Sequence, residues 1–254
     1  IRPDLVERCI ESTPRTITLG GRIPKHDMVL DGSCLRVATN GQATFVQDHH
    51  AGKRRRACVQ DLRDSTRMGH HLDGIDYIWP MVVPSDVPSE SRGLHEMYHS
   101  FACSSKHIQH EIQVPAHVPF ALEMLEVLMG SKAEVRRRPP FSVVSCTVSP
   151  LQHEPRMAEL SIDLARAGIP IAVWPMPLTG ATAPLSVPAT CLMSIAEFLS
   201  GVVLFQSAAP GCPLLFPFGP EILDMRSGMA ACGGPEIPLF NLVLGQMARY
   251  YDVP

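Results

Sequence analysis

Residues 171–184, which read IAVWPMPLTGATAP, decide the fold. The first five residues are apolar and partly β-branched, as in a buried strand, and the Pro, Gly and Thr residues that follow are typical of a loop. Apolar residues then recur with helical spacing at Met193, Ala196, Phe198 and Val202. A strand, a loop and a helix in this order make one βα unit, and α/β barrels keep their chemistry in such loops.

Segments of the same kind recur from residue 75 onward. Strand candidates, each followed by a helix candidate, are residues 75–83, 107–112, 141–148, 171–175 and 213–218. Their starts lie 30 to 42 residues apart, which suits right-handed βαβ connections in a parallel sheet. We therefore predict an α/β fold with about five βα units. Because a closed (β/α)8 TIM-type barrel needs eight strands, either the barrel is incomplete in this chain or the strands form an open doubly wound sheet.

The first part of the chain has a different pattern. Short strand candidates are separated by Asp31-Gly32 and Asn40-Gly41, dipeptides that favour tight hairpin turns. These candidates are residues 28–30, 35–37 and 43–46. We predict a small β-meander over residues 26–48. It belongs to an N-terminal cap segment, residues 1–58, which precedes the partial barrel of residues 59–254.

Composition excludes several classes of function. With 254 residues, 45% of them apolar, and a net charge of -3, the chain can hold a sizeable core and offers no electrostatic footprint for nucleic acid. The basic run at residues 53–56 is predicted to be solvated surface ahead of a helix at residues 59–72. We expect no signal peptide and no membrane span, since no apolar run reaches that length. The eight cysteines form no Cys-x-x-Cys pair, which indicates reduced, buried thiols and a cytoplasmic protein.

Motifs along the whole chain identify a family. Besides the loop at residues 177–184, they are Pro140, Ser149-Pro150-Leu151, Ala196-Glu197, Pro210-Gly211-Cys212-Pro213, Gly234-Pro235-Glu236 and the ARYYDVP of residues 248–254. Together they resemble the trimethylamine and glycine betaine family of corrinoid-dependent methyltransferases. The resemblance covers residues 1–254, and members of that family continue further, so we expect this chain to be a fragment. An incomplete barrel exposes a strand edge and apolar lining, so we also expect a homo-oligomer.

The resemblance implies a function. Members of the family are barrel enzymes that move a methyl group from a methylated amine to the cobalt of a corrinoid carried on a separate protein. The enzyme then binds no cofactor directly, and its task is to position the amine over the partner's cobalt. Trimethylamine must be activated, which the trimethylamine enzymes do with a pyrrolysine that would lie beyond Pro254. A member without pyrrolysine, acting on a quaternary amine such as glycine betaine, is the first expectation.

The ends of the predicted strands hold the candidate substrate-binding residues, because these ends converge on one face. The candidates are Glu111, Thr147, Trp174, Met176, Thr179, Phe216, Glu221 and Asp224. Trp174 could stack on a methylammonium cation, and Glu221 and Asp224 could add compensating charge. The alternatives are that Trp174 fills the barrel and that the two acidic residues cap or form salt bridges. Alternation along the second strand places Glu111 with His107 and Gln109, so an internal hydrogen-bond network is its alternative role.

Two other functions stay open at this point. Residues 95–99, HEMYH, fit the pattern in which two histidines one helical turn apart bind zinc in a hydrolase. We expect this helix on the outside of a barrel, however, and no downstream ligand is evident. The other alternative is a non-catalytic module that binds a methylated amine or a corrinoid protein.

Overall fold

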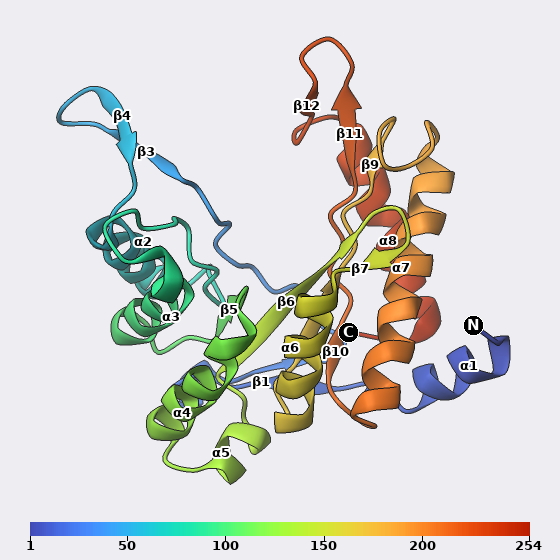
Figure 1. Ribbon diagram of the computed structural model, residues 1–254, viewed down its shortest axis with the longest axis horizontal. Helices are drawn as coiled ribbons and strands as arrows, with labels where there is room; N and C mark the ends of the chain where they lie inside the picture. Colours follow the sequence, from blue (N-terminus) through green and yellow to red (C-terminus); the bar gives the residue numbers. More distant parts are fainter. The chain divides into compact units, whose positions relative to one another are not determined.

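The computed structural model describes residues 1–254, which divide into two compact regions (Figure 1). The terminal region comprises Ile1–Ile17, Val144–Arg166 and Pro170–Pro254, and the central region comprises Thr18–Val143 and Ala167–Ile169. The division at residue 58 expected from the sequence stays a prediction.

The central region alternates short strands with helices. Its elements are β1 (Ile17–Leu19), η1 (Pro24–His26), β2 (Met28–Leu30), β3 (Phe45–Asp48), β4 (Lys53–Arg56), α2 (Val59–His71), η2 (Ser89–Ser91), α3 (Arg92–Cys103), β5 (Ile108–His110), η3 (Pro115–His117), α4 (Val118–Met129), α5 (Lys132–Arg137) and the first residues of β6 (Phe141–Val148). Strand β5 pairs in parallel with the start of β6, through Ile108 opposite Phe141. The helix predicted at residues 59–72 is confirmed as α2.

The strand predicted at residues 75–83 is only partly formed. Ile78 is fully buried and makes a parallel bridge to Ile108, but no continuous strand is present. The physical reason is Pro80, which has no N–H to give to a ladder in the middle of this segment. The segment nonetheless keeps its expected place beside β5.

The predicted β-meander is wrong in its pairing. Strand β2 pairs with β1, and β3 forms an antiparallel hairpin with the basic strand β4. Residues 35–37 form no strand, because Leu35 is 88% exposed and no buried face sets a register. Ala43 instead exchanges backbone hydrogen bonds with Met81 and Val83. All four residues of β4 are exposed, which confirms the solvated basic run.

The terminal region packs helices on parallel strands. Its elements are α1 (Pro3–Glu11), the rest of β6, β7 (Gln152–His153), α6 (Pro155–Ala167), β8 (Ile171–Trp174), β9 (Leu178–Thr179), α7 (Val187–Ala208), β10 (Leu214–Leu215), β11 (Glu221–Asp224), β12 (Met229–Ala230) and α8 (Glu236–Tyr251). Strand β8 lies between β6 and β10, and it is parallel to β10. Figure 1 shows α7 and α8 in this region, with β9, β11 and β12 forming a separate small sheet. The predicted α/β fold with parallel pairing is confirmed, and closure into a barrel stays a prediction.

Helix α7 supplies much of the core of the terminal region. Phe198, Val202 and Phe205 are fully buried, and Gly201 lets β8 approach so closely that an added Cβ would lie 2.6 Å from Val173. The sequence prediction that no apolar segment reaches a membrane-spanning length is wrong for this helix. Its 22 residues are long enough and apolar enough to cross a membrane, by length and composition alone. Half of that apolar window is buried within the protein, and the helix carries a buried glutamate, Glu197, as a core helix of a soluble protein can.

The cysteines only partly follow their prediction. All eight are free thiols, as expected. Cys9, Cys191 and Cys212 are buried, whereas Cys34 and Cys232 are exposed. The error arises because short apolar segments of the sequence can lie at the protein surface, as the exposed side chains of Met229 and Cys232 do.

Candidate functional site

A buried carboxylate, Glu197, organises the end of strand β6. Its Oε2 accepts hydrogen bonds from the hydroxyl groups of Thr147 and Ser149, and its Oε1 accepts the backbone N–H of Leu151 at 2.9 Å. Glu197 is fully buried, so these charge-assisted bonds replace the water that the carboxylate loses on folding. Both oxygens are occupied, and the loop that follows β6 is therefore tied to α7.

Trp174 ends strand β8 and packs against a glycine. A Cβ at Gly219 would lie 2.4 Å from Trp174 Nε1 and 3.3 Å from Met176 Cγ, so a larger residue would displace the indole. The Gly219 N–H donates to the Pro175 carbonyl at 3.2 Å, which holds the segment after β10 along the loop after β8. Met176 is 48% exposed. The structure thus brings two predicted site residues, Trp174 and Met176, together at one loop.

Two further predicted residues belong to the core of the terminal region. Thr179 is 3% exposed, and its hydroxyl lies 2.8 Å from that of Thr190. Phe216 stacks on Phe198 with ring centroids 3.8 Å apart. These contacts pack both side chains into the core at the strand ends. Little of the surface of either side chain is left for a ligand to contact.

The two acidic candidates lie on β11. Asp224 accepts hydrogen bonds from the Ser227 hydroxyl at 2.7 Å and the Arg226 N–H at 3.0 Å, which together hold the pKa of Asp224 below its ordinary value. Asp224 therefore shapes the turn between β11 and β12, as in the alternative role considered for it. A hydrogen bond to the half-buried Glu221 raises the pKa of the Cys232 thiol.

In the central region, the polar face of β5 is an internal hydrogen-bond network. His107 is fully buried, with Nδ1 at 3.0 Å from the Gly20 carbonyl and Nε2 at 2.9 Å from the Ser142 hydroxyl. Burial lowers the pKa of His107 to about 4, so the imidazole is neutral near pH 7. The Gln109 amide also donates to Ser142. Glu111 lies outside this network, beyond the end of β5, and accepts a hydrogen bond from the Gln113 amide at 3.1 Å.

A second buried carboxylate lies on the opposite side of β5. His110 Nε2 is 2.8 Å from Glu96 Oε2, and His110 Nδ1 is 3.0 Å from the Gln42 amide nitrogen. Glu96 and His110 are 5% and 1% exposed. The other carboxylate oxygen, Glu96 Oε1, is buried and has no hydrogen-bond partner. Glu96, His110 and Gln42 line a small cavity of about 80 Å³, together with Glu111.

The zinc pattern of residues 95–99 does not assemble a metal site in residues 1–254. His95 and His99 lie on α3 with their rings stacked and centroids 6.2 Å apart. No group of three or more His, Cys, Asp or Glu side chains that could hold a metal ion is formed. The glutamate of the pattern, Glu96, pairs with His110 instead. The sequence match therefore reflects a helix with two half-buried histidines and one buried glutamate.

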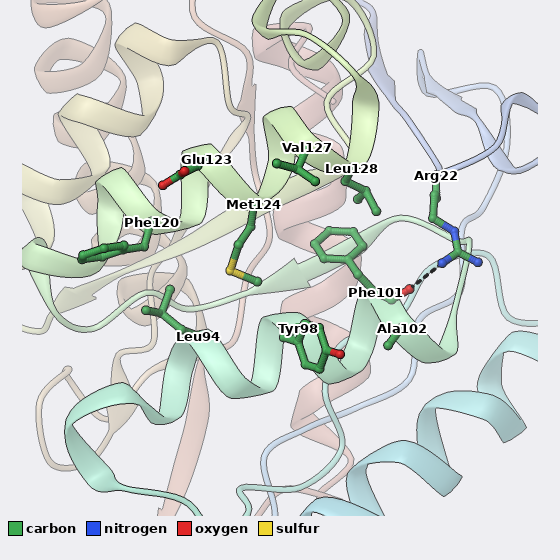
Figure 2. A pocket seen from close by; sticks show the side chains of 10 residues that line it. All are labelled: Arg22, Leu94, Tyr98, Phe101, Ala102, Phe120, Glu123, Met124, Val127 and Leu128. Carbon is green, nitrogen blue, oxygen red and sulfur yellow. Dashed lines mark hydrogen bonds between the residues drawn. The ribbon is translucent and has the colours of Figure 1, made fainter.

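A large apolar cavity lies between α3 and α4 (Figure 2). Its volume is about 630 Å³, and Figure 2 shows Phe101 and Met124 pointing into the space between the two helices. Phe120 and Tyr98 are more than half exposed. Arg22 closes one end and donates to the Phe101 carbonyl at 3.0 Å. Its lining is mostly apolar, with Glu123 as its one carboxylate, so we do not assign the chemistry to this cavity.

Comparison with known proteins places the chain. Residues 1–254 match the model of the family described as trimethylamine methyltransferase (MTTB). The chain belongs to this family. Trimethylamine methyltransferase MttB of Desulfitobacterium hafniense is 31% identical over 250 residues, which cover 98% of this chain and 50% of that protein.

Other members of the MTTB family are similar over the same extent. Glycine betaine methyltransferase of Desulfitobacterium hafniense is 28% identical over 256 residues, covering 99% of this chain and 52% of that protein. Trimethylamine methyltransferase MttB of Methanosarcina thermophila is 28% identical over 255 residues, which cover 98% of this chain and 53% of that protein. The chain spans about half the length of the curated relatives it matches. The family recognised from the sequence motifs is confirmed.

The structure explains two of the motifs that carried this recognition. Ser149-Pro150-Leu151 and Ala196-Glu197 lie far apart in the sequence, and Glu197 accepts hydrogen bonds from the first and last residues of the former. The two motifs therefore form one hydrogen-bonded cluster in this MTTB family member. Glu197 belongs to the motifs quoted from the sequence but was assigned no role there, and the signal that could have found it is a lone charge in a long apolar helix.

Glu96 and His110 were missed as a pair. Glu96 was interpreted only as part of the zinc pattern. The alternation that places Glu111 with His107 and Gln109 turns His110 to the other face of its strand, where its neighbours Ile108 and Ile112 are apolar. A polar residue on an apolar strand face needs a buried partner, which was the available signal. The partner itself could not be named, because contacts between a helix and a strand do not follow from spacing in the sequence.

Proposed function

We propose that this protein is a methyltransferase that removes a methyl group from a methylated amine, with a quaternary amine such as glycine betaine as the first candidate. Its membership of the MTTB family over all 254 residues carries the proposal. Trimethylamine methyltransferases and a glycine betaine methyltransferase are among its relatives. Because the chain spans about half of their length, the activity of the whole protein is part of the proposal.

Trp174 is the proposed contact for the cationic head of the amine. An aromatic face attracts a quaternary ammonium ion through its quadrupole, and such a cation offers no N–H for a carboxylate to accept. Gly219 and the loop after β8 hold the indole in place, and the exposed thioether of Met176 lies beside it. Together the two side chains offer a polarisable surface for the methyl groups.

Glu197 is proposed to position this site and not to react. It holds the Ser149-Pro150-Leu151 loop at the end of β6 through both of its oxygens. We further propose that the methyl acceptor is a corrinoid on a partner protein, whose reduced cobalt supplies the nucleophile. The chain's own residues then bind and orient the amine, which removes the entropy cost of bringing the two reactants together.

The proposal is tested by measuring binding of glycine betaine to the wild-type protein and to Trp174→Leu and Trp174→Phe. A cation over an aromatic face contributes about 1 to 2 kcal/mol, so Trp174→Leu should weaken binding about 5- to 30-fold. Trp174→Phe keeps an aromatic ring and should lose less. Equal affinity in all three proteins would remove Trp174 from the site.

The methyl transfer itself needs a second measurement. Methylation of a reduced corrinoid protein in the presence of glycine betaine, followed by the change in corrinoid absorbance, should depend on the protein. Binding of the amine without any transfer would favour the non-catalytic binding module instead.

Three expectations about the whole molecule also stay proposals. We propose that the βα units belong to a (β/α)8 barrel, that the protein is cytoplasmic, and that it forms a homo-oligomer. The exposed apolar side chains of α3 and α4 support self-association, since large apolar patches on a surface usually mark contacts. Light scattering that gives a monomer mass would contradict the oligomer.

A further inference from the structure

We propose that the cavity beside Glu96 in the central region binds a small ammonium ion that carries at least one N–H. Glu96 is 5% exposed and lines the cavity, and its Oε1 is buried without a partner. A buried carboxylate oxygen that makes no hydrogen bond is costly, because folding takes it out of water and returns nothing. A ligand that donates to Oε1 removes this cost.

The rest of the carboxylate is held in place by its neighbours. The Gln42 amide nitrogen donates to His110 Nδ1, so the proton of a neutral His110 is on Nε2 and points at Glu96 Oε2. The chain of Gln42, His110 and Glu96 therefore orients Glu96 with one oxygen satisfied and one available. A site built this way is formed before its ligand arrives, which lowers the cost of binding.

The charges around the cavity favour a cation. Glu96 and Glu111 are its two carboxylates, against the single guanidinium of Arg92, whose Nε is also buried without a partner. His117 adds no necessary positive charge, because its Nε2 can donate to the Glu90 carbonyl, 2.6 Å away, in the neutral form. With His110 and His117 both in their neutral forms, the two carboxylates outnumber the one guanidinium and the lining is net negative. Its volume of about 80 Å³ admits a ligand of only a few non-hydrogen atoms.

The requirement for an N–H sets the chemical class of the ligand. Ammonium and protonated mono-, di- or trimethylamine can donate to Glu96 Oε1, whereas a quaternary ammonium ion cannot. The cavity should therefore hold amines that have lost a methyl group and reject fully methylated ones. The site depends on the buried carboxylate and not on methyl transfer by this protein, so it can be tested separately from the proposed function.

The test is a ligand-observed NMR titration of the protein with dimethylammonium chloride and, separately, tetramethylammonium chloride at matched chloride concentration. For a ligand this small we expect saturable binding of dimethylammonium with a Kd no tighter than about 1 mM. Tetramethylammonium should bind at least about 10-fold more weakly, since it forms no hydrogen bond to Glu96. Equal binding of the two cations, or no saturation by dimethylammonium, overturns the proposal, and the second result would mean that the cavity holds water only.

Two variants assign the binding to Glu96. Glu96→Gln keeps the shape of the side chain and should weaken dimethylammonium binding about 10- to 100-fold, while Glu126→Gln on α4, outside the cavity, should leave it unchanged. If Glu96→Gln does not fold, Gly93→Ala tests the site in its place and should also weaken dimethylammonium binding. Its added methyl group enters the cavity, where the nearest neighbour is His117 Nδ1, 3.9 Å away. Alanine also favours the helix. Wild-type affinity in a folded Glu96→Gln or Gly93→Ala protein refutes the site.

Discussion

Two buried glutamates, Glu197 in the terminal region and Glu96 in the central region, have the same side chain and opposite environments. Both lie on helices and are at most 5% exposed. Glu197 receives three hydrogen bonds, which occupy both of its oxygens. Glu96 receives one, from His110, and its second oxygen receives none. The satisfied carboxylate ties two elements of the fold together, whereas the unpartnered oxygen of Glu96 is the observation behind the proposed ammonium site.

The largest expected effect is the loss of stability on changing Glu197. Glu197→Gln keeps one acceptor oxygen but presents an NH₂ group to at least one of the three donors, so buried groups are left unsatisfied. We expect the free energy of unfolding to fall by about 3 kcal/mol, measured by urea denaturation. Glu159→Gln, at an exposed position of α6, is the matched control and should stay within about 0.5 kcal/mol. A loss below about 1 kcal/mol would show that Glu197 is not the satisfied carboxylate described above.

The second effect is a dependence of stability on pH. It arises from the hydrogen-bonded network around His107, the counterpart in the central region of the satisfied Glu197. Burial lowers the pKa of His107 to about 4, against 6.5 for an unperturbed histidine. Between these values the unfolded chain binds a proton that the folded protein does not, so stability falls as pH decreases from about 6.5 towards 4. At pH 5 the loss from this group should be about 2 kcal/mol relative to pH 7.

The measurement compares urea unfolding of wild type and His107→Asn at both pH values. The Asn amide can still donate to the Gly20 carbonyl, which His107 Nδ1 faces at 3.0 Å, and it does not titrate. The change in unfolding free energy between pH 7 and pH 5 is compared for the two proteins. The difference between these two changes isolates His107 from the carboxylates that titrate in the same range. Equal changes in unfolding free energy with pH would mean that His107 does not remain neutral in the folded state.

The third effect tests packing at the proposed amine site of the terminal region. Gly219→Ala places a methyl group 2.4 Å from Trp174 Nε1, so the indole must move, at a cost of about 1 to 2 kcal/mol. In a Trp79→Phe background the emission of Trp174 alone can be followed, since the chain has two tryptophans. Gly233→Ala, which meets no atom within 4 Å, is the control. An unchanged emission spectrum in Gly219→Ala would contradict the close contact with Trp174.

The smallest effect is expected at Glu96 and bears directly on its contrast with Glu197. Glu96→Gln retains an oxygen for the His110 Nε2–H and directs its NH₂ group towards the cavity, so unfolding should become easier by only about 1 kcal/mol. Urea denaturation beside Glu197→Gln gives the comparison. If both variants lose the same stability, Glu96 is as fully satisfied as Glu197, and the distinction between them fails.

Much of the fold could be predicted from hydrophobic patterns. Residues 141–148 were predicted as a strand with the bounds of β6, and β8 and α2 agree within one residue. The N-terminal meander failed because turn dipeptides such as Asn40-Gly41 do not choose the partner strand. Ala43 found its backbone partners at Met81 and Val83, which no local signal indicates.

The candidate site was predicted less completely. Trp174 and Met176 were expected at the end of β8, and they lie there side by side against Gly219. Phe216 was also placed at a strand end, but its stacking on Phe198 makes it part of the core. A strand end predicts the neighbourhood of a side chain, while its direction and exposure depend on the helix packed against it.

The sequence by itself determined the family, the α/β class and the positions of the main strands β6 and β8, because motifs and periodicity are local properties of the chain. Only the tertiary structure decided which of two similar glutamates is satisfied. Glu197 meets its donors across nearly fifty residues of sequence at the end of β6, and Glu96 meets only His110 from β5. The number of donors around a buried carboxylate depends on how separate elements pack, and that number separates a structural group from one that can bind a ligand.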